Sequence, residues 1–427
     1  CERLVREGRH EPITDRYRLT LEEEYRLVSA QGLRVLAVAF RPAKADMESF
    51  DELVPDREKP FIPQLVFVGW VGLKDPVRPE ISRVFATMRQ AGVRQVIVTG
   101  DHPSTVQAVV RELGWEVPQE RVMTGIDLEA LDDDALARRI FSIDVFARVE
   151  PRHKMRIVQA FRKNGEVVAM LGDGVNDAPA LKAADIGVAV NAGTDIAKET
   201  ADLLLLDNHF GVIVAAIREG RVMFDNIRRI FIFLVSDSFA EVVVIALAML
   251  FQLPMPLTAV QILWMNLVSD TFPNLALTLE RASDDVMKRK PRPRSSPIVN
   301  REIGLLIAIT TVSAGLSAFI LYVYVLSKTG SIEYARTMVF TMTSLDSMFY
   351  VLSIRHLHIP LWRMPFFSNP ALFAGILTSV SLQCLAVYVP AMQEVFGTVA
   401  ISGKDWLLIL AAGLLQIAAI EAFKARF

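Results

Sequence analysis

Residues 167–181 carry the sequence VVAMLGDGVNDAPAL, in which an apolar run passes directly into a turn rich in glycines and carboxylates. Asp173 and Asp177 lie four positions apart in this turn, and Asn176 lies between them. Carboxylate oxygens are ligands that Mg²⁺ prefers, and glycines allow the backbone to approach phosphate oxygens closely. A solvated turn is the alternative, but the length of the ordered motif favours a magnesium and phosphate site directly after a strand.

The segment around this motif alternates short β-branched runs with amphipathic stretches, from about residue 64 to residue 218. We expect strands at residues 65–71, 95–98, 167–171 and 186–190, and helices at residues 81–91, 103–113 and 153–163. This alternation predicts an α/β fold with a doubly wound parallel sheet, whose functional residues lie at the carboxyl ends of its strands. A strand-like run at 34–39 and a charged, proline-containing connection at 41–62 precede it.

Two further groups in this half are suited to phosphate binding. Thr99, Gly100 and Asp101 follow the strand expected at 95–98, where a hydroxyl and a backbone N–H group can bind phosphoryl oxygens. Lys154 lies near the start of a helix and falls between the other two motifs in chain order. Taken singly, the tripeptide is typical of a turn and the lysine of a solvated charge. In this order, the three groups predict a site of phosphoryl transfer.

The second half of the chain has the composition of a membrane domain. The whole chain is 52% apolar, and its mean hydropathy of +0.34 is high for a soluble protein. Apolar stretches occur at residues 230–253, 257–279, 303–327, 337–354, 371–393 and 406–422. Most of them reach the roughly 20 helical residues that a hydrocarbon core of ~30 Å requires. We therefore expect an all-α membrane domain of about six helices, of which the fourth and the sixth are short.

Charges in the loops predict how these spans are oriented. Basic residues gather in alternate loops: Arg228, Arg229, Lys288, Arg289, Lys290, Arg292, Arg294, Arg355, Arg363, Lys424 and Arg426. The only basic residues of the other loops are Lys328, Arg336 and Lys404. By the positive-inside rule, residues 1–229 and the C-terminus face the cytoplasm. We expect the plasma membrane as the location, although the loop charges do not specify which membrane it is. The total charge, 46 basic against 48 acidic residues, is uninformative about partners, and no nucleic-acid partner is expected.

Ionisable residues inside the spans predict an ion path, because such residues are costly in lipid and are functional candidates by default. Asp237 and Glu241 are spaced to share one helical face, and Asn266, Ser269 and Asp270 are expected to share another. Pro273 should interrupt the second of these helices.

For Asn266 or Ser269 alone, a hydrogen bond between helices is an equal alternative to cation binding. For Glu241 and Asp270 together, a cation site is favoured. Asp346 is a further candidate, with an ion pair or a protonated side chain as its alternative.

The order of threonine, lysine and paired aspartates resembles the haloacid-dehalogenase phosphotransferases, and more narrowly the phosphorylation domain of P-type cation-transporting ATPases. Residues 75–80, DPVRPE, match that family's hinge-side segment, and the resemblance covers nearly the whole chain. It implies a remnant of a nucleotide-binding domain at 1–65, a phosphorylation domain at 66–218 and a membrane domain at 219–427.

The resemblance also implies roles for individual residues, with ATP and Mg²⁺ as cofactors. Asp173 would ligate Mg²⁺, supported by Asp177 and Asn176. Lys154 would neutralise the transferring phosphoryl group, while Thr99 and Gly100 would hydrogen-bond it. Asp101 and Arg34, the latter in the sequence GLRVLA at 32–37, would lie towards the nucleotide.

In the membrane domain, the sequence LWMNLVSD at 263–270 is similar to the ion-binding span of calcium-type pumps, and Glu241 matches the glutamate of their preceding span. The resemblance implies Glu241, Asn266, Ser269 and Asp270 as cation ligands, with Asp237 and Asp346 as additional candidates. Two-site calcium pumps carry an asparagine where this chain has Ser238, so one calcium site is expected to be weakened or lost. Ca²⁺ is the leading cation, and no partner subunit is indicated.

The family's nucleophilic aspartate, in the sequence Asp-Lys-Thr-Gly-Thr, does not occur in these 427 residues. Because the first residue is Cys1 rather than Met, we expect the chain to be the C-terminal part of a longer pump, unable by itself to form the aspartyl phosphate. The alternatives are a truncated, non-catalytic pump or regulator and a membrane-anchored phosphatase of the haloacid-dehalogenase type. A largely helical connection at 200–229 is expected to link the phosphoryl site to Glu241.

Overall fold

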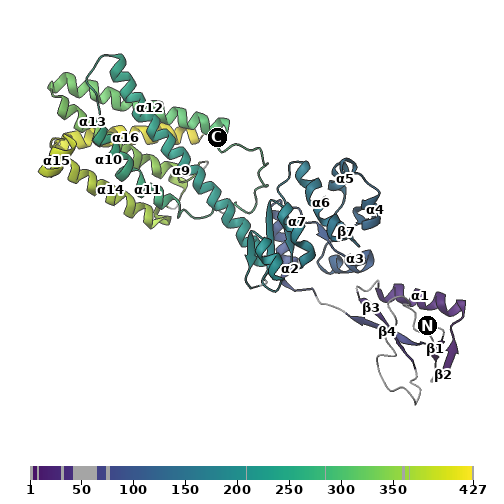
Figure 1. Ribbon diagram of the computed structural model, residues 1–427. Helices are drawn as coiled ribbons and strands as arrows, with labels where there is room; N and C mark the ends of the chain where they lie inside the picture. Colours follow the sequence, from purple (N-terminus) through teal and green to yellow (C-terminus); the bar gives the residue numbers. More distant parts are fainter. Residues whose placement is uncertain are drawn as a thin grey trace. The chain divides into compact units, whose positions relative to one another are not determined.

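The computed structural model describes residues 3–6, 9–29, 33–41, 65–73, 77–207, 209–283, 285–357, 361–364 and 366–425. They form two compact units, each of which is described by itself. Unit 1 comprises Cys1–Ala215 and Met287–Arg294, and unit 2 comprises Ala216–Val286 and Ser295–Phe427. Unit 1 consists of strands with short helices, whereas unit 2 is helical (Figure 1).

The first part of unit 1 is a four-stranded sheet of order β2-β1-β4-β3, accompanied by helix α1 (Asp15–Ser29). Its strands are β1 (Arg3–Arg6), β2 (Arg9–Pro12), β3 (Arg34–Phe40) and β4 (Val66–Leu73). The strand expected at 65–71 is therefore present, but it belongs to this mixed sheet, where it runs parallel to β1, and not to the doubly wound parallel sheet. β4 pairs with β3 in antiparallel register from Arg34↔Leu73 to Phe40↔Val66. Residues 42–62 of the expected connection lie outside the described residues.

The remainder of unit 1 contains two parallel sheets of three strands each. Their orders are β5-β7-β6 and β10-β9-β8. The strands are β5 (Ile97–Val98), β6 (Val122–Thr124), β7 (Val145–Ala147), β8 (Ala169–Gly172), β9 (Ile186–Val190) and β10 (Leu203–Leu205). The prediction of one continuous sheet is wrong, because among the described strands β5 and β8 are not paired and the two sheets are separate. The parallel α/β character of this region is confirmed.

Short helices precede or follow the strands of these two sheets along the chain. They are α2 (Glu80–Gln90), α3 (Pro103–Glu112), α4 (Gly125–Glu129), α5 (Asp133–Arg139), α6 (Pro151–Lys163), α7 (Ala178–Ala183) and α8 (Asp195–Thr200). Both α3 and α6 begin with proline, which lacks an N–H group that the first turn would leave unpaired. The apolar face of α6, including Ile157 and Phe161, packs in one core with Leu128, Ile140 and Phe146. This core fixes Lys154 relative to β7.

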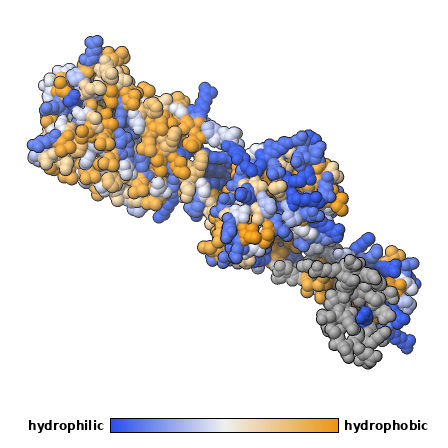
Figure 2. All heavy atoms as spheres, in the orientation of Figure 1, coloured by the Kyte–Doolittle hydropathy of each residue, from blue (hydrophilic) through white to orange (hydrophobic). Residues whose placement is uncertain are grey.

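Unit 2 is built from long apolar helices. Within the described residues, five helices are long and apolar enough to cross a membrane: α9 (Gly211–Leu250), α12 (Arg301–Thr329), α13 (Ile332–Ile354), α14 (Pro370–Tyr388) and α16 (Gly403–Lys424). Hydrophobic side chains cover much of the visible surface of these helices (Figure 2). The fourth and sixth expected spans are longer than their apolar stretches suggested. The fifth ends at Tyr388 because Pro390 starts a separate helix, α15 (Pro390–Phe396).

Helix α9 replaces most of the connection expected at 200–229. That connection is not helical throughout, since β10 occupies Leu203–Leu205 and the helix begins only at Gly211. From there α9 continues without interruption for 40 residues, or about 60 Å at 1.5 Å per residue. Gly315, in the middle of α12, packs closely against α9. A Cβ atom at this position would lie 2.9 Å from the carbonyl oxygen of Ala240.

The second expected span, 257–279, is divided into three pieces. Helix α10 (Ala259–Trp264) leads into a π-helix (Met265–Ser269), and α11 (Thr271–Leu277) follows. The break lies before Pro273 rather than at it, which corrects the expected position. Proline excludes the carbonyl group four residues earlier, so hydrogen bonding is disturbed in the preceding turn. The N–H of Asp270 accordingly donates to the carbonyl of Met265, five residues back, at 3.1 Å.

Candidate functional site

Lys154 and Asp177 are brought together at the carboxyl end of β8. The Nζ atom of Lys154 donates to Oδ1 of the buried Asp177, which anchors the motif's second carboxylate. Gly172 makes this possible, because a Cβ atom there would lie 2.5 Å from the Cβ of Asp177. Only glycine leaves room for this carboxylate under the strand end. The lysine from α6 and the aspartate after β8 therefore form one charged site.

Asp173 has a different environment from Asp177. Its side chain is exposed, while its carbonyl oxygen accepts a hydrogen bond from the N–H of Thr194 at 2.9 Å. A Cβ atom at Gly193 would lie 2.9 Å from the same oxygen, so the loop after β9 packs against this turn through a glycine. Asn176 is exposed on the same turn. An accessible carboxylate beside a second, buried one is a donor set that fits Mg²⁺.

Thr99 and Asp101 form a closed turn at the end of β5. The hydroxyl of Thr99 donates to Oδ2 of Asp101 at 3.0 Å and accepts from the N–H of Asp101 at 3.1 Å. Gly100, between them, is exposed. Backbone hydrogen bonds from Val149 to Thr99 and from Arg148 to Asp101 fix this turn against the end of β7. The threonine hydroxyl is thus held locally, and the exposed backbone of Gly100 is open to a phosphate.

Arg148 is a residue at this edge that the sequence analysis did not single out. It adopts the left-handed backbone region, with φ of 50°, which is uncommon for a residue other than glycine and is concentrated at functional sites. Its exposed guanidinium lies close enough to His102 to lower the pKa of that imidazole, although burial is the larger cause of the shift. The only signal in the sequence is its place in ARVEP, directly before the helix of Lys154.

Three residues expected in this half, Arg34, Asp75 and Pro76, lie wholly or partly outside the described residues. The side chain of Arg34 lies outside the described residues, although its backbone begins β3. Asp75 and Pro76 of the hinge-side segment also lie outside them.

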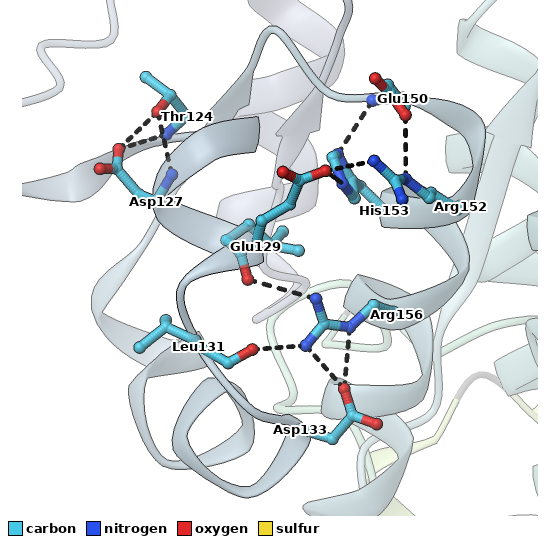
Figure 3. Close-up of polar contacts among 10 residues, drawn as sticks. Thr124, Asp127, Glu129, Leu131, Asp133, Glu150, Arg152, His153 and Arg156 are labelled. Carbon is cyan, nitrogen blue, oxygen red and sulfur yellow. Dashed lines mark hydrogen bonds and ion pairs between the residues drawn. The ribbon is translucent and has the colours of Figure 1, made fainter.

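A cluster of Glu129, Glu150 and His153 has the composition of a metal site, and its ligand atoms lie within 4.8 Å of one another (Figure 3). Its hydrogen bonds argue against that function. Nδ1 of His153 accepts from the N–H of Glu150 at 3.1 Å, so Nε2 carries the proton and faces Glu129 at 3.1 Å. Arg152 binds both carboxylates. A histidine whose Nδ1 accepts and whose Nε2 donates has no lone pair left for a metal, and the cluster caps α6.

This assignment predicts the response of the chain to zinc. We expect micromolar Zn²⁺ to leave its thermal unfolding temperature unchanged relative to a sample containing EDTA. Replacing His153 by glutamine should lower the free energy of unfolding by about 1 to 3 kcal/mol, because the part-buried N–H of Glu150 at the α6 cap loses its partner. Scanning calorimetry of the full chain measures both effects. A rise in unfolding temperature with Zn²⁺ that disappears in His153→Gln would show that the cluster binds metal.

In unit 2, Asp237 and Glu241 lie on the inward side of α9. Glu241 is buried, and its Oε1 has no hydrogen-bond partner within the described part of the chain. Asp237 accepts a hydrogen bond from the hydroxyl of Ser347 on α13 at 2.5 Å and is close enough to Glu241 for repulsion between the two carboxylates. Ser238 is exposed and lies on another side of the helix. Ser238 is therefore not among the inward-facing residues of α9.

The broken second span contributes Ser269 and Asp270. Both side chains are buried, and among the described residues no donor group contacts the hydroxyl of Ser269 or either carboxylate oxygen of Asp270, which instead faces the carboxyl group of Asp237. Asn266 does not share this buried face: its side chain is exposed, and its Nδ2 donates to the carbonyl of Ile262 at 2.9 Å. It nevertheless interacts with Glu241. The π-helix changes the angle between successive side chains, so Asn266 lies at the edge of the expected face, exposed yet within reach of Glu241.

Asp346 supplies a further buried carboxylate from α13. Both of its oxygens and the hydroxyl of the neighbouring Ser344 lack partners among the described residues. A Cβ atom at Gly413 of α16 would lie 3.3 Å from Oδ1 of Asp346, so the carboxylate faces bare backbone there. Asp346 is also within electrostatic range of Asp237.

Orphaned oxygens thus converge from three helical segments of unit 2. Glu241, Ser269, Asp270 and Asp346 are all at most 8% exposed, yet each retains at least one unsatisfied oxygen. An unpaired polar group in a low-dielectric interior costs free energy, so a cluster of acceptors without donors is typical of a site for a cation. A haloacid-dehalogenase-like unit together with a helical unit of this kind defines an ion-transporting ATPase architecture.

Comparisons with known proteins agree with this class. Residues 254–426 match the family model described as cation transporting ATPase, C-terminus, and residues 5–185 and 155–217 match two models described as haloacid dehalogenase-like hydrolase. The calcium-transporting ATPase of Bacillus subtilis is 38% identical over 392 residues, which are 91% of this chain and 43% of that protein.

Two eukaryotic relatives show similar coverage. Calcium-transporting ATPase 1 of Saccharomyces cerevisiae is 36% identical over 94% of this chain and 42% of its own length, and calcium-transporting ATPase type 2C member 2 of Rattus norvegicus is 35% identical over 93% and 40%. The chain belongs to the P-type cation-transporting ATPases and is an integral membrane protein. It spans less than half the length of these curated relatives.

Proposed function

We propose that this chain is the part of an ATP-driven pump that contains the ion path and most of the phosphoryl-transfer site, and that the transported cation is Ca²⁺. One observation carries the proposal: buried carboxylate oxygens of Glu241, Asp270 and Asp346 converge in unit 2 without donors among the described residues. Hard cations such as Ca²⁺ prefer such oxygens. The names of the relatives, all calcium-transporting, support this choice of cation.

In unit 1, the charged residues at the carboxyl end of β8 have proposed roles in phosphoryl transfer. Asp173 would hold Mg²⁺ with support from Asp177 and Asn176, and the ion would supply positive charge to the phosphate oxygens. Lys154, fixed by its ion pair with Asp177, would place a second positive charge beside the transferring group. Such positioned charges dominate catalysis of phosphoryl transfer, where little covalent chemistry is required of the protein.

The neighbouring groups would position ATP. The exposed backbone at Gly100 and the Thr99 turn would hydrogen-bond the phosphoryl group, while Asp101 and Arg34 would lie towards the nucleotide. The nucleophilic aspartate of the family's Asp-Lys-Thr-Gly-Thr motif would come from the rest of the whole protein, since the motif does not occur in this chain.

In unit 2, we propose Glu241, Asn266, Ser269 and Asp270 as ligands of the transported cation, with Asp237 and Asp346 completing the site. Residues 1–229 and the C-terminus would face the cytoplasm of a cell whose plasma membrane contains the pump. Helix α9 would couple the two processes, because a single uninterrupted helix leads to Asp237 and Glu241. Events at Asp173 that displace this helix would change the affinity for the cation.

Cation-dependent ATP hydrolysis by the complete protein tests this proposal. We expect micromolar Ca²⁺ to stimulate hydrolysis and transport into sealed vesicles, whereas Mg²⁺ alone should support neither. A panel of Ca²⁺, Mn²⁺, Zn²⁺ and Na⁺ under the same conditions identifies the preferred ion. Hydrolysis that no member of the panel stimulates would contradict the proposal and would favour a membrane-anchored phosphatase.

A further inference from the structure

Unit 2 contains a buried ion pair that the cation site does not use. Arg355, which follows α13, is fully buried, and Glu280, which follows α11, is 3% exposed. The guanidinium binds the carboxylate in a two-point geometry: Nε donates to Oε2 and Nη2 donates to Oε1, each at 3.0 Å. Arg355 also donates to the hydroxyl of Ser368. Such a pair has a large desolvation cost and is retained only where its geometry is well satisfied.

Asn369 joins the same carboxylate to the end of α11. Its Nδ2 donates to Oε2 of Glu280 and to the carbonyl of Ala276, both at 3.0 Å, while its Oδ1 caps α14 by accepting from the N–H of Leu372. The last turn of α11 is therefore bound to the ends of two other helices, α13 and α14. Every polar atom that contributes to this junction comes from unit 2.

Asn226 of α9 hydrogen-bonds the segment that follows α11, at Thr278 and Glu280. Its buried Nδ2 donates to the carbonyl of Thr278 at 3.0 Å and to the backbone carbonyl of Glu280 at 3.3 Å. The guanidinium of Arg229, one turn further along α9, donates to Oδ1 of Asn226 at 2.6 Å and fixes the orientation of the amide. The polypeptide after α11 is thus hydrogen-bonded to three helices within a few residues.

We propose that this junction, formed by Asn226, Glu280, Arg355 and Asn369 and named here the Glu280 clasp, positions α11 so that Asp270 faces Glu241. The inference rests on the proposed function, because it assigns the clasp a role in cation affinity. Glu280 is a positioning residue: α11 is only Thr271–Leu277, and its other end is the irregular turn that contains Ser269 and Asp270. A short helix attached to a broken turn has no fixed position of its own. The clasp supplies that position and links it to α9, which carries Glu241.

The charges around the clasp are compatible with a permanent anchor rather than a pH switch. Burial raises the pKa of Glu280, but hydrogen bonds from Arg355 and Asn369 outweigh this, so its pKa lies below the ordinary value. His356 lies nearby, and burial, followed by the Arg229 guanidinium, lowers its pKa to about 4. The imidazole is therefore neutral at neutral pH. Between pH 6 and 8 we expect the ionic state of the clasp to be constant.

The test compares two glutamates that are equally buried, each 3% exposed, but bind different partners. Glu280→Gln removes the charge that fixes Arg355. Glu421→Gln is the matched control: Glu421 is also buried, and it pairs with Lys424 at 2.7 Å and accepts from Ser353 and from the N–H of Leu361, none of which belongs to the broken span. Both variants are made in the complete protein. The double variant Glu280→Gln/Arg355→Gln avoids leaving an unpaired buried cation.

We expect Glu280→Gln and the double variant to raise the Ca²⁺ concentration for half-maximal hydrolysis by about 10-fold, since fewer molecules have a competent site. The KM for ATP should be unchanged. A general loss of structure would change the KM for ATP as well as the Ca²⁺ affinity. Glu421→Gln should retain wild-type Ca²⁺ affinity. Equal affinities in all variants, or an equal loss in Glu421→Gln, would overturn the clasp alone. A wild-type protein that Ca²⁺ does not stimulate would overturn the proposed function, and the clasp with it.

Discussion

Replacing Asp173 by asparagine in the complete protein is expected to lower cation-dependent ATP hydrolysis by at least about 100-fold, as loss of one preorganised charge-stabilising group does in other enzymes. The substitution retains the size of the side chain but removes a negative charge from the proposed Mg²⁺ ligand set. Because Asp173 is exposed and its side chain supports no packing, the fold should be unaffected. Steady-state hydrolysis and phosphoenzyme turnover with radiolabelled ATP measure the effect.

The matched control for this experiment is Asp134→Asn. Asp134 is an exposed aspartate of the same unit that forms an ion pair with Lys163 on the surface, away from the strand ends. Exposed ion pairs contribute little to stability, so its hydrolysis rate should equal that of the wild type. Asp173→Asn with normal phosphoenzyme turnover would show that the phosphoryl site has been misassigned.

Replacing Asp270 by asparagine is expected to weaken Ca²⁺ activation by more than about 100-fold, or to abolish it. The asparagine keeps the shape of a buried side chain whose two oxygens both lack partners, but it offers one neutral oxygen instead of a carboxylate. Affinity of an oxygen site for Ca²⁺ depends strongly on its number of charged ligands. Titration of ATP hydrolysis with buffered free Ca²⁺, together with equilibrium binding of ⁴⁵Ca²⁺ without ATP, measures the loss directly.

Ser238→Ala is the informative control, because Ser238 lies on the same helix as Glu241 but its side chain is exposed. We expect it to retain wild-type affinity, even though it occupies the position of an asparagine ligand in two-site pumps. An unchanged Ca²⁺ titration in Asp270→Asn would exclude the proposed ion path. A large loss in Ser238→Ala would instead place the cation on a different side of α9.

The elements with a strong local signal were predicted closely from the sequence. The strand expected at 186–190 is β9, because a β-branched run is flanked there by turn residues. Helix α3 begins at Pro103, as expected, since proline favours a first helical position. By contrast, β6, β7 and β10 contain only three residues each and carry too short a pattern to be distinguished from a loop.

Sheet membership and the faces of irregular helices were less predictable. The β4 run reads as a buried strand, but a local pattern does not specify whether its partner is parallel or antiparallel. The expected site residues Lys154 and Asp177 meet in space, whereas the face expected for Asn266 assumed regular helical angles that the π-helix does not keep. The Glu280 clasp could not be predicted, because its members are separated by up to 143 residues in sequence, from Asn226 to Asn369.

The uneven distribution of charge along α9 restricts how this helix can move. Its first half contains Arg218, Arg221, Arg228 and Arg229, whereas the part from residue 230 to residue 250 contains only Asp237 and Glu241 as charged side chains. A piston-like slide of one helical turn, ~5.4 Å, would carry two arginines towards the hydrocarbon, where each costs up to about 3 kcal/mol at the bilayer centre. Tilting, bending and rotation about the helix axis avoid this penalty. A signal that travels along α9 is therefore best transmitted as a change of angle at constant depth.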